Sequence, residues 1–116
     1  MQIGGAGFVV IYQWRLKDGR EPQFLKAWAA LTVHLQAHRG AGASRLHRTD
    51  YGTLMAYAQW PDQATWERSC DAHEADQALS DALLDAVDET WPPILMTPLS
   101  DRPVTGAQAV GGHVTH

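Results

Sequence analysis

The sequence of 116 residues contains no asparagine, one cysteine and no long apolar run. With Cys70 alone, the chain cannot form an intrachain disulfide, a zinc site of four thiolates or an iron–sulfur cluster. A membrane-spanning helix needs about 20 apolar residues, so we expect no membrane partner. The apolar residues near the N-terminus follow no basic residue, unlike those of a signal peptide. These absences predict a cytoplasmic protein.

Charge is distributed unevenly along the chain, whose net charge at pH 7 is −4. Residues 1–61 carry seven basic and three acidic side chains, whereas residues 62–101 carry ten acidic side chains and only Arg68 as a base. Nucleic-acid binding needs a basic surface, so this acidic half argues against a nucleic-acid partner. The acidic run predicts a solvated outer helix face. The alternative is an electrostatic bias against anionic substrates or toward a basic partner.

The first half of the chain predicts a strand, a helix and a hairpin. Residues 8–17 are mostly β-branched or aromatic, and the first half of this strand is apolar on both faces. A helix follows, with Pro22 in its first turn and Gly40 as its C-cap. Its apolar face contains Phe24, Trp28, Leu31 and Leu35, widened by Leu25 and Thr32.

A β-hairpin is expected over residues 43–60, with a three-residue loop in which Gly52 takes the left-handed conformation. If Thr49 opposes Thr53, Arg45 faces Tyr57 and His47 faces Met55. One sheet face then carries Arg45, His47, Tyr57 and Gln59. The other face carries Leu46, Leu54, Ala56, Ala58 and Trp60.

The second half predicts two helices and a last strand. Asp62 is the expected N-cap of a helix that contains Trp66 and breaks near residues 70–74. A third helical segment is expected from Ala75 to Val87, before Trp91-Pro92-Pro93. Its outer face would hold Asp76, Asp81, Asp85, Asp88 and Glu89. A short strand at 94–99 would lie at a sheet edge because of Pro98.

This order of elements predicts an α+β protein with a ferredoxin-like βαββαβ antiparallel sheet over residues 1–100. Such a sheet has helices on one face only. Because the first strand is apolar on both faces, we expect a second copy to cover the other face, as a dimeric α+β barrel. Residues 101–116 form a polar tail, expected to lie along the partner subunit or over a pocket mouth.

Residues in both halves carry a family resemblance. They are Tyr12-Gln13-Trp14-Arg15, Gly19-Arg20, Phe24 with Trp28, Ser44-Arg45-Leu46-His47-Arg48, Gly52, and Tyr57-Ala58-Gln59-Trp60-Pro61 with Trp66. Over about residues 8–100 the chain resembles the antibiotic biosynthesis monooxygenase superfamily, a group of dimeric α+β barrels. The resemblance implies a homodimer with a small apolar pocket between each sheet and its helices. It also implies an oxygenase without flavin, metal or nicotinamide, because the electron-rich substrate supplies the electrons.

The missing asparagine separates the chain from part of this superfamily. Heme-degrading and aromatic-oxidising members usually rely on an asparagine near the sheet, and this chain has none. A heme-degrading activity is therefore disfavoured, and no catalytic residue is transferred from the resemblance.

The candidate catalytic residues are Arg45, His47 and Tyr57. His47 or Tyr57 can move a phenolic proton near neutral pH, and Arg45 can pair with a developing oxyanion. The alternative is a polar edge or a dimer contact.

Four tryptophans could wall an aromatic-binding pocket, because flat rings stack and exclude water. They are Trp14, Trp28, Trp60 and Trp66, of which Trp14, Trp28 and Trp66 are the expected substrate-binding residues. The alternative is that they are core residues, especially Trp28.

His34 and His38 are spaced like half of a metal site, but the sequence places no third ligand. We therefore expect a solvated pair and no metal. Cys70 is expected to be an ordinary cysteine at a helix end rather than a nucleophile.

The sequence, together with the family resemblance, thus predicts a small cofactor-independent monooxygenase-like enzyme acting on a compact aromatic or polyketide-type compound. The alternative from another class is a non-catalytic dimer that binds a small ligand, for instance in a stress response.

Overall fold

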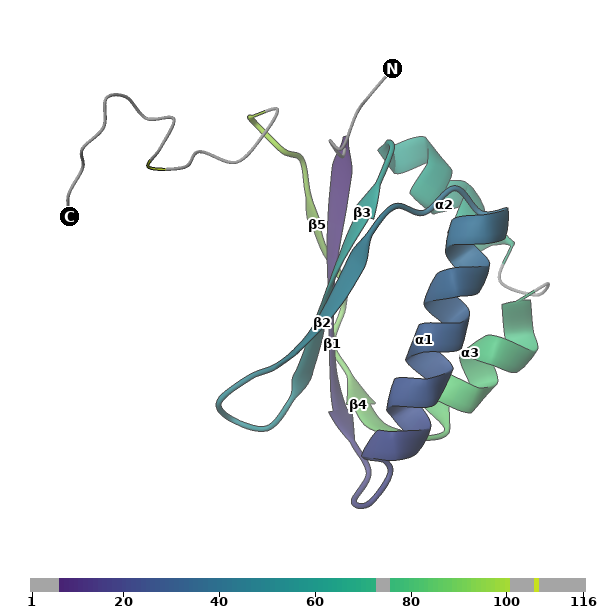
Figure 1. Cartoon of the computed structure of the whole chain (residues 1–116), viewed down its shortest axis with the longest axis vertical. Coiled ribbons are helices and arrows are strands. Elements are labelled where there is room, and N and C mark those ends of the chain that lie inside the picture. The colour runs from purple at the N-terminus through teal and green to yellow at the C-terminus, as the bar shows by residue number, and fades with distance from the viewer. Residues whose placement is uncertain (1–6, 73–75, 101–105, 107–116) are drawn as a thin grey trace.

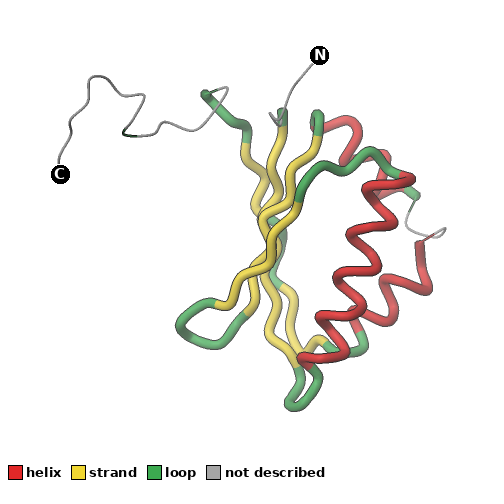
Figure 2. The backbone as a smooth tube through the Cα atoms, viewed as in Figure 1, coloured by secondary structure: helices red, strands yellow, loops and turns green. Residues whose placement is uncertain are grey.

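The computed structural model describes residues 7–72, 76–100 and 106. In chain order the elements are β1 (Phe8–Leu16), α1 (Glu21–His38), β2 (Ser44–Arg48), β3 (Leu54–Trp60), α2 (Gln63–Asp71), α3 (Gln77–Leu84), β4 (Val87–Thr90) and β5 (Ile94–Met96). One antiparallel sheet has the order β2-β3-β1-β4, and β5 also pairs with β1. Figures 1 and 2 show the helices together on one face of this sheet. The predicted α+β, ferredoxin-like fold is confirmed.

The hairpin formed by β2 and β3 has the predicted register. Arg45 opposes Tyr57 and His47 opposes Met55. The Thr49 N–H donates to the carbonyl oxygen of Thr53 at 2.9 Å, and Gly52 has a φ of 92°. The loop therefore has the expected three residues, and its glycine occupies the left-handed region that other residues rarely adopt.

Strand β1 lies in the middle of the sheet and presents a different set of side chains to each face. Tyr12 and Trp14 pack toward the helices, opposite Ala56 and Leu54 of β3. On the outer face, Ile11 lies between Tyr57 of β3 and Ile94 of β5. Among the described residues, no second layer covers this outer face (Figure 1).

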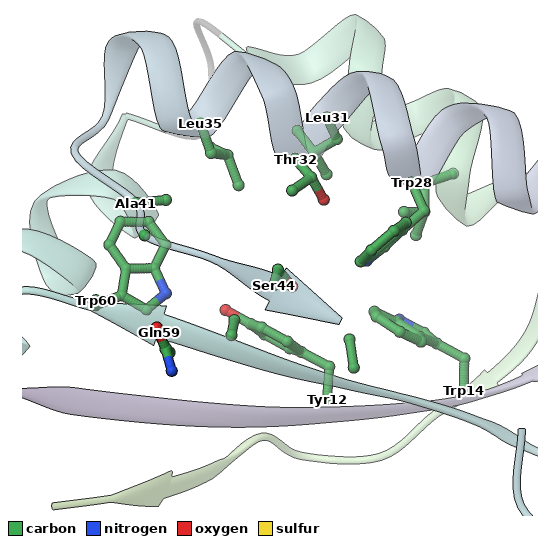
Figure 3. Close-up of a pocket in the computed structure, with 14 residues that line it drawn as sticks. Tyr12, Trp14, Trp28, Leu31, Thr32, Leu35, Ala41, Ser44, Gln59 and Trp60 are labelled. Carbon is green, nitrogen blue, oxygen red and sulfur yellow. The ribbon is translucent and has the colours of Figure 1, made fainter. Parts of the chain in front are cut away.

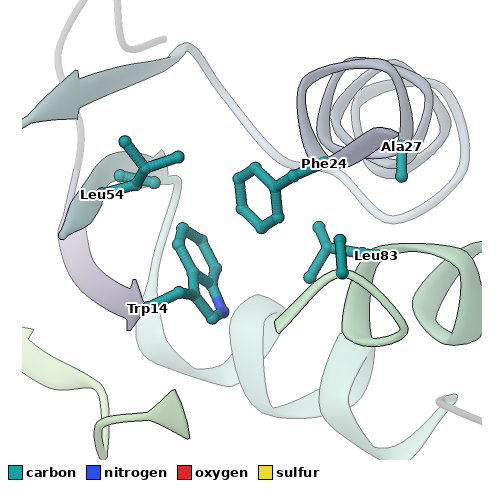
Figure 4. Close-up of a cluster of buried hydrophobic side chains, with 7 residues drawn as sticks. Trp14, Phe24, Ala27, Leu54 and Leu83 are labelled. Atoms are coloured by element: carbon teal, nitrogen blue, oxygen red, sulfur yellow. The ribbon is translucent and has the colours of Figure 1, made fainter. Parts of the chain in front are cut away.

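The main core lies between α1, α3 and the sheet (Figure 4). Phe24 of α1 is fully buried, and its ring meets that of Trp14 edge-on with centroids 5.0 Å apart. Leu54 and Leu83 close the cluster from β3 and α3. The predicted helix face is confirmed at Phe24, whereas Leu25 is 42% exposed and does not widen it.

The prediction for residues 75–91 was wrong in part. Helix α3 ends at Leu84, and Val87, which we expected on the apolar face of a helix, begins strand β4. Thr90 and Glu89 pair with Trp14 and Arg15 of β1, so pairing with a free sheet edge outweighs the local helical pattern. Pro92 and Pro93 then separate β4 from β5, which ends at Met96 and is shorter than the predicted strand at 94–99.

Asp76 is a second departure, since we expected it on a solvated face. Its carboxylate is 5% exposed and accepts hydrogen bonds from Arg39 at 2.9 and 3.1 Å. His34 Nε2 lies 2.7 Å from the same carboxylate, so His34 and His38 are not the expected solvated pair. A basic end of α1 facing the start of α3 explains why this acidic residue is buried.

The predicted tail lies almost wholly outside the described residues, which include only Gly106 beyond position 100. Its placement along a partner or over a pocket stays a prediction.

Candidate functional site

A cavity of about 170 Å³ lies between α1 and the sheet (Figure 3). Trp28, Leu31 and Leu35 reach it from α1, and Tyr12, Trp14 and Trp60 reach it from the sheet. The space lies where Ala56 and Ala58 of β3 present only methyl groups to the cavity. An apolar, aromatic cavity with a few polar groups is typical of small-ligand sites, and this volume suits a compact ligand.

Tyr12 is one of the polar residues that line the cavity. Trp66 Nε1–H donates to the Tyr12 hydroxyl oxygen at 2.9 Å, and the Tyr12 ring stacks on that of Trp14 with centroids 5.8 Å apart. Burial raises the pKa of Tyr12, although the hydrogen bond from Trp66 opposes this. Tyr12 therefore keeps its proton near neutral pH. Because its oxygen accepts the hydrogen bond from Trp66, its own O–H can donate a hydrogen bond to a ligand.

Helix α2 holds Trp66 against Tyr12. The Asp62 carboxylate accepts from the backbone N–H of Thr65 at 2.7 Å, as expected for the N-cap of this helix. The ring of Trp66 also packs against Phe8, with centroids 5.8 Å apart. Trp66 does not line the cavity itself, so its contact with the site passes through the Tyr12 hydroxyl.

Trp60 supplies a second polar atom. Its side chain is 3% exposed, and Figure 3 shows the nitrogen edge of its indole turned toward the cavity. Within residues 7–72, 76–100 and 106, no hydrogen-bond partner is found for Trp60 Nε1. A buried donor without an acceptor costs about 1–3 kcal/mol.

Arg45, His47 and Tyr57 lie on the other face of the sheet. They line a second hollow, of about 380 Å³, with Ala43, Ser44 and Gln59. The structure brings these three side chains together, as the hairpin register predicted, but the sheet separates them from Trp14 and Trp28. Ser44 and Gln59 border both hollows. All three predicted catalytic side chains are exposed to solvent.

Tyr12 was not among the site residues predicted from the sequence. The available signal was its position two residues before Trp14, which places both rings on one face of a strand. The pairing of Tyr12 with Ala56, which opens the cavity beside its ring, depends on the β1–β3 register.

Other site types find little support in the described part of the chain. It contains no cluster of three or more His, Cys, Asp or Glu side chains that could hold a metal ion. Cys70 is an exposed cysteine. Partial burial of its side chain raises the pKa of the thiol, as do the nearby charges of Asp71 and Glu67. The described helices include none that is both long and apolar enough to cross a membrane.

Comparison with known proteins gives a family and several structural neighbours. The sequence pattern of the family described as antibiotic biosynthesis monooxygenase matches residues 7–88. No curated protein matches the chain.

Solved structures that share this fold include an oxygenase, an antibiotic biosynthesis monooxygenase and a NIPSNAP domain protein. The cofactor-independent oxygenase SnoaB from Streptomyces nogalater is 18% identical with a TM-score of 0.68, and the match covers 85% of this chain and 100% of that one. A structure described as an antibiotic biosynthesis monooxygenase is 20% identical with a TM-score of 0.64, covering 80% and 99%. An uncharacterized NIPSNAP domain protein from Burkholderia xenovorans is 16% identical with a TM-score of 0.64, covering 84% and 99%. At these identities the similarity concerns the fold.

Proposed function

The chain belongs to the antibiotic biosynthesis monooxygenase family, and on this basis we propose that it is a monooxygenase whose substrate binds in the cavity beneath α1. The observation that carries the proposal is the partly buried Tyr12 hydroxyl, which accepts a hydrogen bond from Trp66 at the wall of an aromatic cavity. The substrate is a compact aromatic or polyketide-type compound, because the walls are apolar rings and the volume is small. The description of SnoaB as cofactor-independent supports the same chemistry here.

The proposed reaction uses electrons from the substrate. An electron-rich ring with an acidic CH₂ group adds O₂ at that carbon to give a CH–OOH hydroperoxide, which loses water and leaves a carbonyl group. One oxygen atom is then in the product and the other in water, and the substrate is the only reductant. Trp14 and Trp28 orient the ring, and the Tyr12 O–H stabilises negative charge on a substrate oxygen.

Oxygen consumption with an anthrone, a ring ketone with an acidic CH₂ group, tests the proposal. We expect the protein to accelerate consumption and Tyr12→Phe to slow it about a hundredfold, as removal of a proton donor or oxyanion partner does. The substitution keeps the ring and removes only the hydroxyl. Equal rates for the two proteins would contradict the role of Tyr12. Anthrone binding without oxygen consumption would favour the non-catalytic, ligand-binding alternative.

The outer hollow is a second candidate site, supported by the grouping of Arg45, His47 and Tyr57 around one space. There Arg45 would hold an oxyanion, and His47 or Tyr57 would move the proton. Tyr57→Phe is the matched variant, since it makes the same chemical change as Tyr12→Phe on the opposite face of the sheet. A hundredfold slower reaction in Tyr57→Phe or His47→Ala, with Tyr12→Phe unaffected, would move the chemistry to this hollow.

We also propose that the protein is a homodimer joined through the outer sheet face. Ile94 and Met96 of β5 are 53% and 39% exposed, and they lie beside Ile11 and Val9 of β1. Together with Tyr57, which is 37% exposed, these residues form an apolar area in the middle of the face. A second copy would remove this area from water, as the family resemblance implies.

A further inference from the structure

The buried indole of Trp60 presents an unused hydrogen-bond donor to the cavity. The side chain is 97% buried, being 3% exposed, and its Nε1–H finds no acceptor among residues 7–72, 76–100 and 106. More than nine in ten buried polar groups in proteins have a partner, so an unpaired one needs an explanation. A phenylalanine would fill the same apolar position without leaving a donor unpaired.

The position of the Trp60 ring is fixed by its neighbours. It packs with Phe8 and Val10 in a second small core, which Trp66 also contacts. At the backbone, the Gly7 N–H donates to the Trp60 carbonyl oxygen at 3.1 Å. The donor is therefore held in place rather than carried on a mobile side chain.

The surroundings of this donor indicate the kind of acceptor that fits it. Figure 3 shows the Tyr12 hydroxyl pointing toward the Trp60 end of the cavity. Each described residue that lines the cavity is uncharged, so nothing there compensates a carboxylate, phosphate or ammonium group. A neutral oxygen acceptor on a ring can pair with the indole N–H without such a cost.

We propose that Trp60 is a specificity-determining residue, whose Nε1–H selects uncharged ring compounds that carry a carbonyl or hydroxyl oxygen at this end of the cavity. The inference rests on the proposed function, since it takes the cavity beneath α1 as the substrate site. It adds the substrate class: an oxygen-bearing ring is preferred over the same ring without oxygen, and over an acid of the same size.

Two bicyclic probes of nearly equal shape separate this role from simple packing. 1-Tetralone carries one ring carbonyl, and tetralin is the same skeleton without oxygen. Their dissociation constants are measured by calorimetry under nitrogen for the wild type, Trp60→Phe and Trp28→Phe. We expect the preference for tetralone over tetralin to fall about five- to tenfold in Trp60→Phe, which corresponds to one hydrogen bond.

Trp28→Phe is the matched control, because Trp28 also lines the cavity and loses the same part of its ring. It should weaken both probes alike and leave their ratio unchanged. An unchanged ratio in Trp60→Phe, or an equal fall in Trp28→Phe, overturns the proposal.

A second measurement needs only the wild-type protein, so it does not depend on the variant folding. The indole N–H signals of the five tryptophans are followed in ¹H–¹⁵N correlation spectra, after the signal of Trp60 has been assigned. Tetralone should shift the Trp60 signal downfield, whereas tetralin should not. No difference between the probes at this signal would overturn the proposal.

The oxygen-consumption and probe-binding assays distinguish failure of the proposed function from failure of the proposed role of Trp60. If the anthrone consumes no oxygen but the tetralone preference depends on Trp60, the specificity role stands and the oxygenase activity fails. If oxygen is consumed at a rate that depends on Tyr12 while the two probes bind equally, the activity stands and the role of Trp60 fails.

Discussion

Asp76 offers a sharp test of what holds the helices over the cavity. Its carboxylate joins the last turn of α1, through His34 and the adjoining Arg39, to the start of α3. Leu83 of α3 lines the cavity, so this connection positions one of its walls. We predict that Asp76→Ala destabilises the protein and loosens that wall.

The expected size follows from burial. Removing one partner of a fully buried ion pair costs about 3–5 kcal/mol, whereas exposed pairs are worth up to about 1 kcal/mol. Asp76 is 5% exposed, but Arg39 and His34 are 24% and 27% exposed and can still reach water. We therefore expect a loss of about 2 kcal/mol in the free energy of unfolding, a shift of about 1 M in the urea midpoint for a domain of this size.

The effect should depend on pH in one direction. The hydrogen bonds from Arg39, with a smaller contribution from His34, hold the pKa of Asp76 below its usual range. Because the pKa of Asp76 is lower in the folded state, its ionised carboxylate stabilises the folded protein. This contribution is complete above the unfolded-state pKa of about 3.9, and it is lost as the pH falls through the folded-state pKa. The difference between wild type and Asp76→Ala should therefore be full at pH 7 and shrink below pH 4.

Urea unfolding at pH 7 and at pH 3, followed by tryptophan fluorescence, measures both effects. Asp81→Ala is the control, since Asp81 is an exposed acid on the same helix and should change stability by less than about 0.5 kcal/mol. If the two variants unfold alike at pH 7, or if the loss in Asp76→Ala is undiminished at pH 3, the ion-pair reasoning is refuted.

Two other perturbations test the core and the proposed dimer. Phe24→Ala should lower the free energy of unfolding by about 3–5 kcal/mol in urea titrations, because its ring is fully buried against Trp14; a loss below about 1 kcal/mol would contradict the core described here. Ile94→Asp should convert a dimer to a monomer in light scattering, since it puts a charge into the outer apolar area, while Val33→Asp on exposed α1 should leave the oligomeric state unchanged. A dimer that survives Ile94→Asp would place the contact elsewhere.

The hairpin register could be read from the sequence because its determinants are local. Gly52 permits the left-handed loop conformation, and alternation on both strands then fixes which residues face each other. The end of α3 could not be predicted from the sequence, because residues 75–87 fit a helical period. Val87 is a strand residue only because it pairs with the edge of β1.

The candidate site was predictable in its parts but not in its arrangement. Aromatic residues beside a predicted sheet indicated a pocket wall, and Trp14 and Trp28 do line the cavity. Which sheet face forms it depends on the pairing of Tyr12 with Ala56, a contact between distant segments that local patterns do not encode. The same long-range register decides that His47 and Tyr12 lie on opposite faces.

Ala56 and Ala58 of β3 limit the size of the ligand that the cavity can hold, but they make none of its side-chain hydrogen bonds. Ala56 and Ala58 border the empty space, whereas the Tyr12–Trp66 hydrogen bond is made by other strands and helices. A larger side chain at position 58 would extend into existing space rather than into packed core, so it would narrow the cavity at little cost to folding. Related chains could thus accept smaller or larger rings through one or two exchanges on β3, with their hydrogen-bonding groups left intact.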